Sequence, residues 1–163
     1  MSIHIDFNVM NQLDATDLRI LDLLQHNSKL TTKEIAAQIG MTTTPVYERI
    51  KRLEKNGYVD KYIALLNREK LGLTLLAFVN VSLKEHNTVF LEKFVESVIS
   101  LPEVMECYHV AGLFDYLLKV IVKDMEAYQH FVSKKLAGLD NIGKVQSSFV
   151  MTEIKHSTAL NVL

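Results

Sequence analysis

The sequence predicts an α+β protein built from two different parts. Its first third carries three helix-start signals in close succession, each with a capping residue flanked by apolar residues. From Leu75 onward apolar residues alternate with a period of two, and strand-like and helix-like segments then follow in the order βαββαβ. The 163 residues, 48% of them hydrophobic, suffice for one domain or for two small ones.

The first predicted helix begins after Asp14, which can accept hydrogen bonds from the free N–H groups of the first turn. Leu13 and Leu18 stand five positions apart around this cap, as in a hydrophobic staple. Leu18, Leu21 and Leu24 supply an apolar stripe at helical spacing. We therefore expect this stripe to face the core.

The second predicted helix is short. Thr31 and Glu34 form a Thr-x-x-Glu capping box at its start, and Gly40 ends it because glycine tolerates positive φ.

The third predicted helix runs from about Thr42 to about Asn56, with Pro45 in its first turn. At 100° per residue, Val46, Ile50 and Leu53 fall on one side. Hydroxyl, carboxylate and cationic groups occupy the opposite side and its flank. These candidate DNA-binding residues are Thr42, Thr43, Thr44, Glu48, Arg49, Lys51, Arg52 and Lys55.

A short helix, a turn with glycine and a helix with a basic outer face are typical of a helix-turn-helix, whose second helix enters the major groove of DNA. Residues 29–61 hold 7 basic against 4 acidic side chains, although the whole chain has a net charge of −1. The alternative is an ordinary solvated helix face, since charged runs on helices are usually only solubilising. The three ordered helix starts favour the DNA-binding interpretation.

Asn56 and Gly57 then signal a stop, and residues 58–66 are rich in strand formers, which predicts a short extended segment or wing. Residues 67–71 indicate one helical turn that acts as a hinge. The predicted domains are therefore a helix-turn-helix domain over residues 1–66, a hinge over 67–74, and a second domain over 75–163.

In the second domain, the predicted strands are 75–83, 104–110, 116–122 and 145–154. One helix, capped by Asn87 or Thr88, precedes Pro102, and another runs from Asp124 to Gly138. The order is that of a ferredoxin-like domain, with both helices on one face of an antiparallel sheet. Because strands 75–83 and 116–122 carry large apolar residues on both faces, the open face should pack against a second copy, giving a dimer.

The chain resembles the Lrp/AsnC family of transcription regulators over nearly its whole length. The resemblance rests on LDATDLRILDLLQHNSKLTTKEIAAQIGMTTTPVYERIKRLEKNGYV, on CYHVAGLFDYLLKV with its Gly-x-x-Asp-Tyr turn, and on the terminal KHSTAL. It implies a helix-turn-helix, winged or simple, joined to a ligand-binding domain that forms dimers and often rings of four dimers. It also implies an amino-acid effector near that turn. The effector candidates are Gly112, Asp115, Tyr116 and Ser147.

Asp115 has a simpler alternative role, which is to hydrogen-bond the backbone of its own turn. Two other functions also stay open for the chain. One is an architectural DNA-binding protein without a ligand, and the other is a haem-pathway decarboxylase of the same architecture.

No catalytic group, cofactor or metal is expected, because the six histidines show no ligand spacing and Cys107 has no cysteine partner. The start MSIHIDFNVMNQ lacks a signal-peptide pattern, and the most apolar stretch, 71–83, is too short to span a membrane. We therefore expect a cytoplasmic regulator that binds double-stranded DNA and an amino acid.

Overall fold

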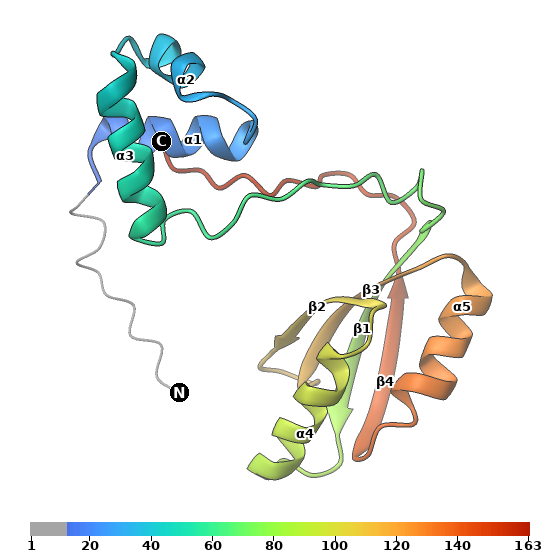
Figure 1. Cartoon of the computed structure of the whole chain (residues 1–163). Helices are drawn as coiled ribbons and strands as arrows, with labels where there is room; N and C mark the ends of the chain where they lie inside the picture. Colours follow the sequence, from blue (N-terminus) through green and yellow to red (C-terminus); the bar gives the residue numbers. More distant parts are fainter. Residues whose placement is uncertain (1–12) are drawn as a thin grey trace. The chain divides into compact units, whose positions relative to one another are not determined.

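The computed structural model describes residues 13–163 (Figure 1). The signal-peptide expectation for the first twelve residues, and the start of the predicted first domain, lie outside the described residues. The chain separates into two units. One contains the residues up to Leu65 together with Lys155–Leu163, and the other is Leu66–Ile154.

The N-terminal unit consists of three helices, α1 (Ala15–His26), α2 (Thr32–Ile39) and α3 (Thr43–Lys55). The predicted caps are present on the first two. The Asp14 side chain accepts from the N–H of Asp17, and Thr31 and Glu34 form the capping box before α2. Gly40 ends α2 with a φ of 71°, in the left-handed region that glycine adopts without strain.

The core of this unit draws residues from all three helices. From α3 it takes the predicted Val46, Ile50 and Leu53. The stripe predicted for α1 was only partly correct, because Leu24 is buried but Leu18 and Leu21 are half-buried. The other residues of α1 that are buried are Ile20 and, unexpectedly, Asp17.

The segment after α3 forms no strand. In the described chain residues 58–66 belong to no sheet, so a strand-built wing is absent there. Tyr58 instead packs against the helical core. The predicted hinge turn is present, since the N–H of Gly72 donates to the carbonyl of Glu69 at 3.0 Å.

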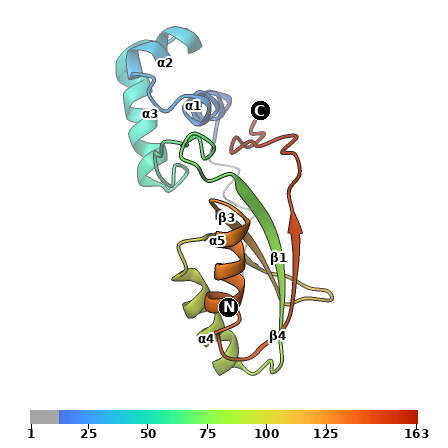
Figure 2. The ribbon, with the colours of Figure 1, turned by 90° about the vertical axis from the view of Figure 1, so that its right-hand side faces the viewer.

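The second unit contains the predicted βαββαβ order. Its elements are β1 (Leu75–Leu83), α4 (Thr88–Ile99), β2 (Val104–His109), β3 (Tyr116–Val122), α5 (Met125–His130), a π-helix η2 (Phe131–Leu136) and β4 (Ile142–Phe149). The strands form one antiparallel sheet in the order β2-β3-β1-β4. Both helices cover the same face of it (Figure 2), which confirms the ferredoxin-like prediction.

Alternate residues of the central strands face the helices. Ala77, Val79 and Val81 of β1 join Phe94 of α4 and Phe131 of η2 in the core. The other face of β1 and β3 presents a set of half-buried apolar side chains outside this core. These residues are Phe78, Leu117 and Ile121.

Several details differ from prediction, and the smallest is that β2 ends at His109 instead of at residue 110. The last strand is Ile142–Phe149 instead of 145–154, because pairing continues past Ser82 through an irregularity that places Leu83 opposite Ile142. The second helix of this unit changes to a π-helix at Phe131, with the N–H of Ala137 donating to the carbonyl of Val132 at 2.8 Å. Gly138 follows, and a side chain there would lie 2.9 Å from the carbonyl oxygen of Lys134.

The C-terminal tail, residues 155–163, belongs to the N-terminal unit, although the predicted second domain extended to residue 163. The Gln25 side chain on α1 binds the backbone of this tail. It donates to the carbonyl of Leu160 and accepts from its N–H, each at 2.8 Å.

Candidate functional site

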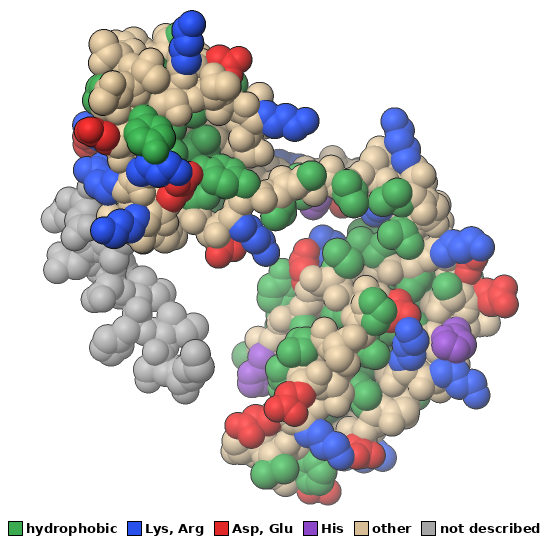
Figure 3. Space-filling model, viewed as in Figure 1, with side chains coloured by type: hydrophobic (Ala, Val, Ile, Leu, Met, Phe, Trp, Pro, Cys, Tyr) green, Lys and Arg blue, Asp and Glu red, His purple; other side chains and the backbone are tan. Residues whose placement is uncertain are grey.

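The outward face of α3 is the candidate nucleic-acid interface. Because Val46, Ile50 and Leu53 hold one side of α3 in the core, its polar side faces solvent. All the predicted DNA-binding residues are exposed except Arg49, which is half-buried. The space-filling view shows Lys and Arg side chains on this part of the unit, with acidic and hydrophobic groups among them (Figure 3).

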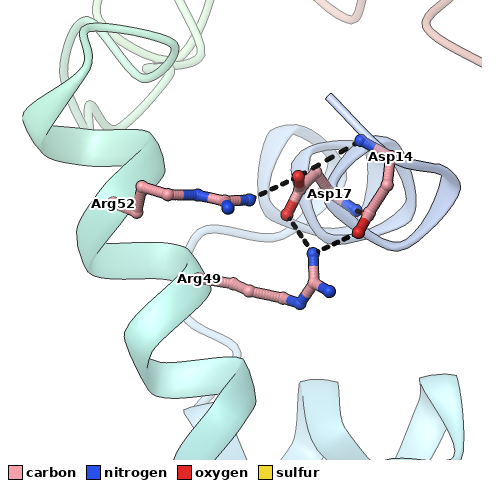
Figure 4. A network of polar contacts seen from close by, with 4 residues as sticks. All are labelled: Asp14, Asp17, Arg49 and Arg52. Carbon is pink, nitrogen blue, oxygen red and sulfur yellow. Dashed lines mark hydrogen bonds and ion pairs between the residues drawn. The ribbon is translucent and has the colours of Figure 1, made fainter. Parts of the chain in front are cut away.

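Arg49 and Arg52 both reach from α3 to the first turn of α1 (Figure 4). Arg49 Nη1 lies 2.7 Å from Asp14 Oδ2 and 2.7 Å from Asp17 Oδ1. Arg52 Nη2 lies 2.5 Å from Asp17 Oδ2. The Asp17 side chain is 1% exposed, so it is a buried carboxylate neutralised by two guanidinium groups.

These contacts shift two protonation equilibria. Hydrogen bonds to Asp17 and then to Asp14 raise the pKa of Arg49. The backbone N–H of Asp17, followed by Arg49, lowers the pKa of Asp14. Asp17 was not predicted from the sequence, in which only Asp14 was assigned a role, as a helix cap. The Asp-x-x-Asp spacing, a capping box with aspartate at both ends, was the available signal.

Tyr47 is a second residue that the sequence analysis missed. It is 52% exposed on the outward side of α3, and Lys51 Nζ lies 5.8 Å from its ring centroid. Lys51 also pairs with Glu54 at 2.7 Å, and Glu54 accepts from the hydroxyl of Tyr62 at 3.0 Å. Burial, followed by this hydrogen bond, raises the pKa of Tyr62 to about 12. Through the hydrogen bond to Glu54, Tyr62, which follows the end of α3, becomes part of the candidate interface.

The candidate effector turn, residues 110–115, connects β2 to β3. The N–H of Val110 donates to the carbonyl of Asp115 at 2.8 Å and closes the turn. Gly112 has a φ of 146°, and apart from Gly112 and its two chain neighbours no described atom lies within 4 Å of the place where a side chain would begin. Its neighbour Leu113 is 94% exposed. The turn therefore presents accessible backbone beside a small residue, as close approach of a small ligand requires.

Asp115 ties this turn to the end of β1. The N–H of Leu83 donates to Asp115 Oδ2 at 2.7 Å, and the N–H of Asp115 donates to the carbonyl of Val81 at 2.9 Å. His86 Nε2 lies 3.0 Å from Asp115 Oδ1. The Leu83 N–H is the largest influence on Asp115 and, with His86, lowers the pKa of its carboxyl group. His86 is a neighbour that the sequence analysis did not identify.

The other two effector candidates face the helix layer. The Tyr116 ring is 3% exposed and lies 4.5 Å from the Phe94 ring and 5.0 Å from the His109 ring, centroid to centroid. Ser147 accepts a hydrogen bond from the hydroxyl of Tyr128 on α5. Within one chain, therefore, the structure does not bring Ser147 to the Asp115 carboxylate. Tyr116 lies nearer, since the charge of Asp115 adds to the effect of burial and of Cys107 in raising the pKa of its hydroxyl.

The described residues offer little for metal or nucleophilic chemistry. Over residues 13–163, no three His, Cys, Asp or Glu side chains converge as a metal site would require. Burial raises the pKa of Cys107, which disfavours its thiolate. In the same part of the chain, no helix is long and apolar enough to cross a membrane.

Comparison with known proteins assigns both units. Residues 13–60 match the family model of the winged helix-turn-helix DNA-binding domain, and residues 76–160 match that of the Lrp/AsnC ligand-binding domain. The DNA-binding transcriptional activator DecR of Escherichia coli K12 is 38% identical over 92% of this chain and 99% of its own length. The leucine-responsive regulatory protein of the same organism is 38% identical over 91% of this chain and 90% of its own length.

A solved structure agrees. The crystal structure of a transcriptional regulator from Neisseria meningitidis in complex with L-Met superimposes with a TM-score of 0.89 and 41% identity, covering 92% of this chain and 97% of that one.

Proposed function

Because the chain belongs to the Lrp/AsnC family of DNA-binding transcription regulators, we propose that it reads DNA with the outward face of α3 and senses a free amino acid at the 110–115 turn. The observation that carries the proposal is the exposure of hydroxyl and cationic side chains on a helix whose opposite side is fixed in a core. A helix held in this way can enter a major groove as a rigid body.

The proposed DNA contacts divide along α3. Recognition helices place their N-terminal residues at base edges, so we assign base contacts to Thr43, Thr44 and Glu48, with Thr42 beside them. Lys51, Arg52 and Lys55 follow toward the C-terminal end and suit phosphate oxygens. Arg49 stands apart, because two carboxylates already engage its guanidinium group.

The proposed effector contacts use both ends of an amino acid. The backbone around Gly112 can donate N–H groups to an α-carboxylate, and the Asp115 carboxylate can accept from an α-ammonium. The Neisseria meningitidis relative was solved with L-Met, which supports an amino acid as the ligand class. Because Tyr116 and Ser147 face the helix layer, we assign neither of them a direct effector contact within one chain.

We further propose that the chain forms a homodimer through the open face of its sheet. Phe78, Leu117 and Ile121 lie on that face outside the core, and a second copy would bury them. Dimers then bring two α3 helices to two half-sites, and four dimers can close into an octamer. We also propose that the protein works in the cytoplasm, where a bacterial DNA-binding regulator such as its relative DecR of Escherichia coli meets DNA.

The test combines DNA selection with an amino-acid screen. The full-length protein is used to select duplexes from a random-sequence pool, and its thermal unfolding is measured with each of the twenty amino acids. Enrichment of a pseudo-palindromic duplex, together with stabilisation by one class of amino acid, supports the proposal. DNA binding without sequence enrichment or amino-acid stabilisation would favour the architectural alternative. Turnover of an iron tetrapyrrole without DNA selection would favour the decarboxylase alternative.

A further inference from the structure

The two arginines that bind Asp17 differ in how much of each side chain remains exposed for a further contact. Arg49 is 26% exposed, and its Nη1 is shared between Asp14 and Asp17. Arg52 is 50% exposed and gives Asp17 a hydrogen bond from Nη2 (Figure 4). A guanidinium group carries five N–H donors in a planar fork, so Arg52 can serve Asp17 and a second anion at once.

Because Asp17 is buried, its carboxylate must be paired with charged groups of the protein. A carboxylate without water is very costly unless charged partners satisfy it, so both arginines are drawn toward α1. Asp17 therefore fixes the direction of the Arg52 side chain, which on an exposed helix face would otherwise sample many rotamers. The position of a long cation is thus set by a residue on another helix.

The place of Arg52 on α3 suggests what the second anion is. At 100° per residue, Arg52 lies between the buried side of α3 and the outward side that carries Lys55 and Thr44. It also stands in the last turn of the helix, away from the N-terminal end that meets base edges. A side chain at the rim and near the C-terminal end of a groove-bound helix meets the phosphate backbone.

We propose that Asp17 is a positioning residue for DNA binding: it holds the Arg52 guanidinium so that its exposed N–H groups contact a backbone phosphate, while Arg49 neutralises the acidic pair and does not touch DNA. The proposal rests on the proposed function, in which α3 binds DNA. It reassigns Arg49, which the sequence placed among the DNA contacts, to the internal network. Its distinctive claim is that Asp17 affects DNA affinity through Arg52 alone.

The experiment measures affinity for a labelled duplex that the unaltered protein selects from a random pool, over a range of salt concentrations. Arg52→Ala should lower affinity roughly tenfold and reduce the slope of log K against log salt by about one. Arg52→Lys should also lose affinity, because a single ammonium cannot bridge two anions as a planar fork does. Arg49→Ala should lower stability but keep the affinity and salt slope of the folded protein.

Asp17→Asn tests the positioning claim, with Asp22→Asn as the matched control. Asp22 lies on the same helix and contacts Gln25 and His26, so its substitution removes the same charge without touching α3. Relative to Asp22→Asn, Asp17→Asn should weaken DNA binding severalfold in the unaltered protein and not at all in the Arg52→Ala background. Such a double-mutant cycle separates action through Arg52 from a loss of folded protein, which would appear in both backgrounds.

Several results would overturn the proposal. The first is an Arg52→Ala variant whose DNA affinity and salt slope are unchanged. The second is an Arg49→Ala variant that loses as much DNA affinity as Arg52→Ala does. The third is a loss of affinity in Asp17→Asn that is no larger than in Asp22→Asn, or that persists in the Arg52→Ala background. If circular dichroism shows Asp17→Asn to be unfolded, Arg52→Lys decides, and full affinity in that variant overturns the bridge. The proposed function fails separately, if Thr44→Ala and Lys55→Ala also leave DNA binding intact.

Discussion

The carboxylate of Asp115, at the end of the effector turn, accepts a 2.7 Å hydrogen bond from the backbone N–H of Leu83, at the end of β1. Asp115 therefore has a structural task within the chain before any ligand arrives. This task differs from both roles considered from the sequence, which were an effector contact and a bond to its own turn backbone. A ligand that binds the same carboxylate would compete with this hydrogen bond and so act directly on the end of β1.

The first prediction concerns the stability of that junction. Asp115→Ala leaves the Leu83 N–H without its acceptor in a partly buried place, so the free energy of unfolding should fall by about 1–3 kcal/mol. Asp115→Asn keeps an acceptor oxygen of nearly the same size and should cost less. Urea unfolding followed by circular dichroism measures both. Equal losses in the two variants would show that the charge, and not the hydrogen bond, matters.

The second prediction is the pH dependence of this contribution. Because the folded-state pKa of Asp115 lies below its ordinary value of 3.8, its stabilisation is present above that value and is lost as pH falls through the folded pKa. The stability advantage over Asp115→Asn should shrink as the pH falls below about 4. Lowered pKa values at Asp14, Glu34 and Glu54 cancel in this difference. An advantage that persists unchanged at pH 2.5 would contradict the assignment.

The third prediction concerns the effector. If the carboxylate of Asp115 receives an α-ammonium group, both Asp115→Ala and Asp115→Asn should lose the thermal stabilisation by the amino acid that stabilises the unaltered protein. Basal affinity for a selected duplex should change little, because α3 is untouched. Calorimetry on the three proteins provides the measurement. A variant that still binds the amino acid normally would restrict Asp115 to its bond with Leu83.

The fourth prediction separates base readers from phosphate binders on α3. Lys55→Ala should weaken binding to all duplexes alike and reduce the salt slope by about one, whereas Thr44→Ala and Glu48→Ala should alter the preferred base at one position. Fluorescence anisotropy with a selected duplex and its single-base variants distinguishes these outcomes. Uniform effects in all three variants would mean that α3 reads no base through these side chains.

The fifth prediction is that residues 66–154, which form a unit of their own, associate as at least a dimer. Light scattering gives the mass directly. Ile121→Lys on the open face should then yield monomers, while Lys123→Glu just beyond the end of β3 should not. A fragment that is monomeric without substitution would move the interface away from this sheet face.

The sequence alone determined the elements of both units. Capping residues mark the ends of a helix locally, so Asp14, Thr31 and Gly40 placed α1 and α2 without knowledge of the rest of the chain. Alternation with period two likewise placed β1 and β3 with their observed bounds, and the βαββαβ order followed. The outward side of α3 was also predictable, because helical geometry fixes which residues oppose Val46, Ile50 and Leu53.

Only the tertiary structure decided what those residues contact. The burial of Asp17 and its pairing with Arg52 join positions 35 apart in sequence, and the bond between Leu83 and Asp115 joins positions 32 apart. The start of β4 and the place of the 155–163 tail likewise depend on distant partners, Leu83 and Gln25. Periodicity and capping report the conformation of a short segment, whereas the partner of a charged or polar side chain is fixed only when packing brings another segment within hydrogen-bonding distance.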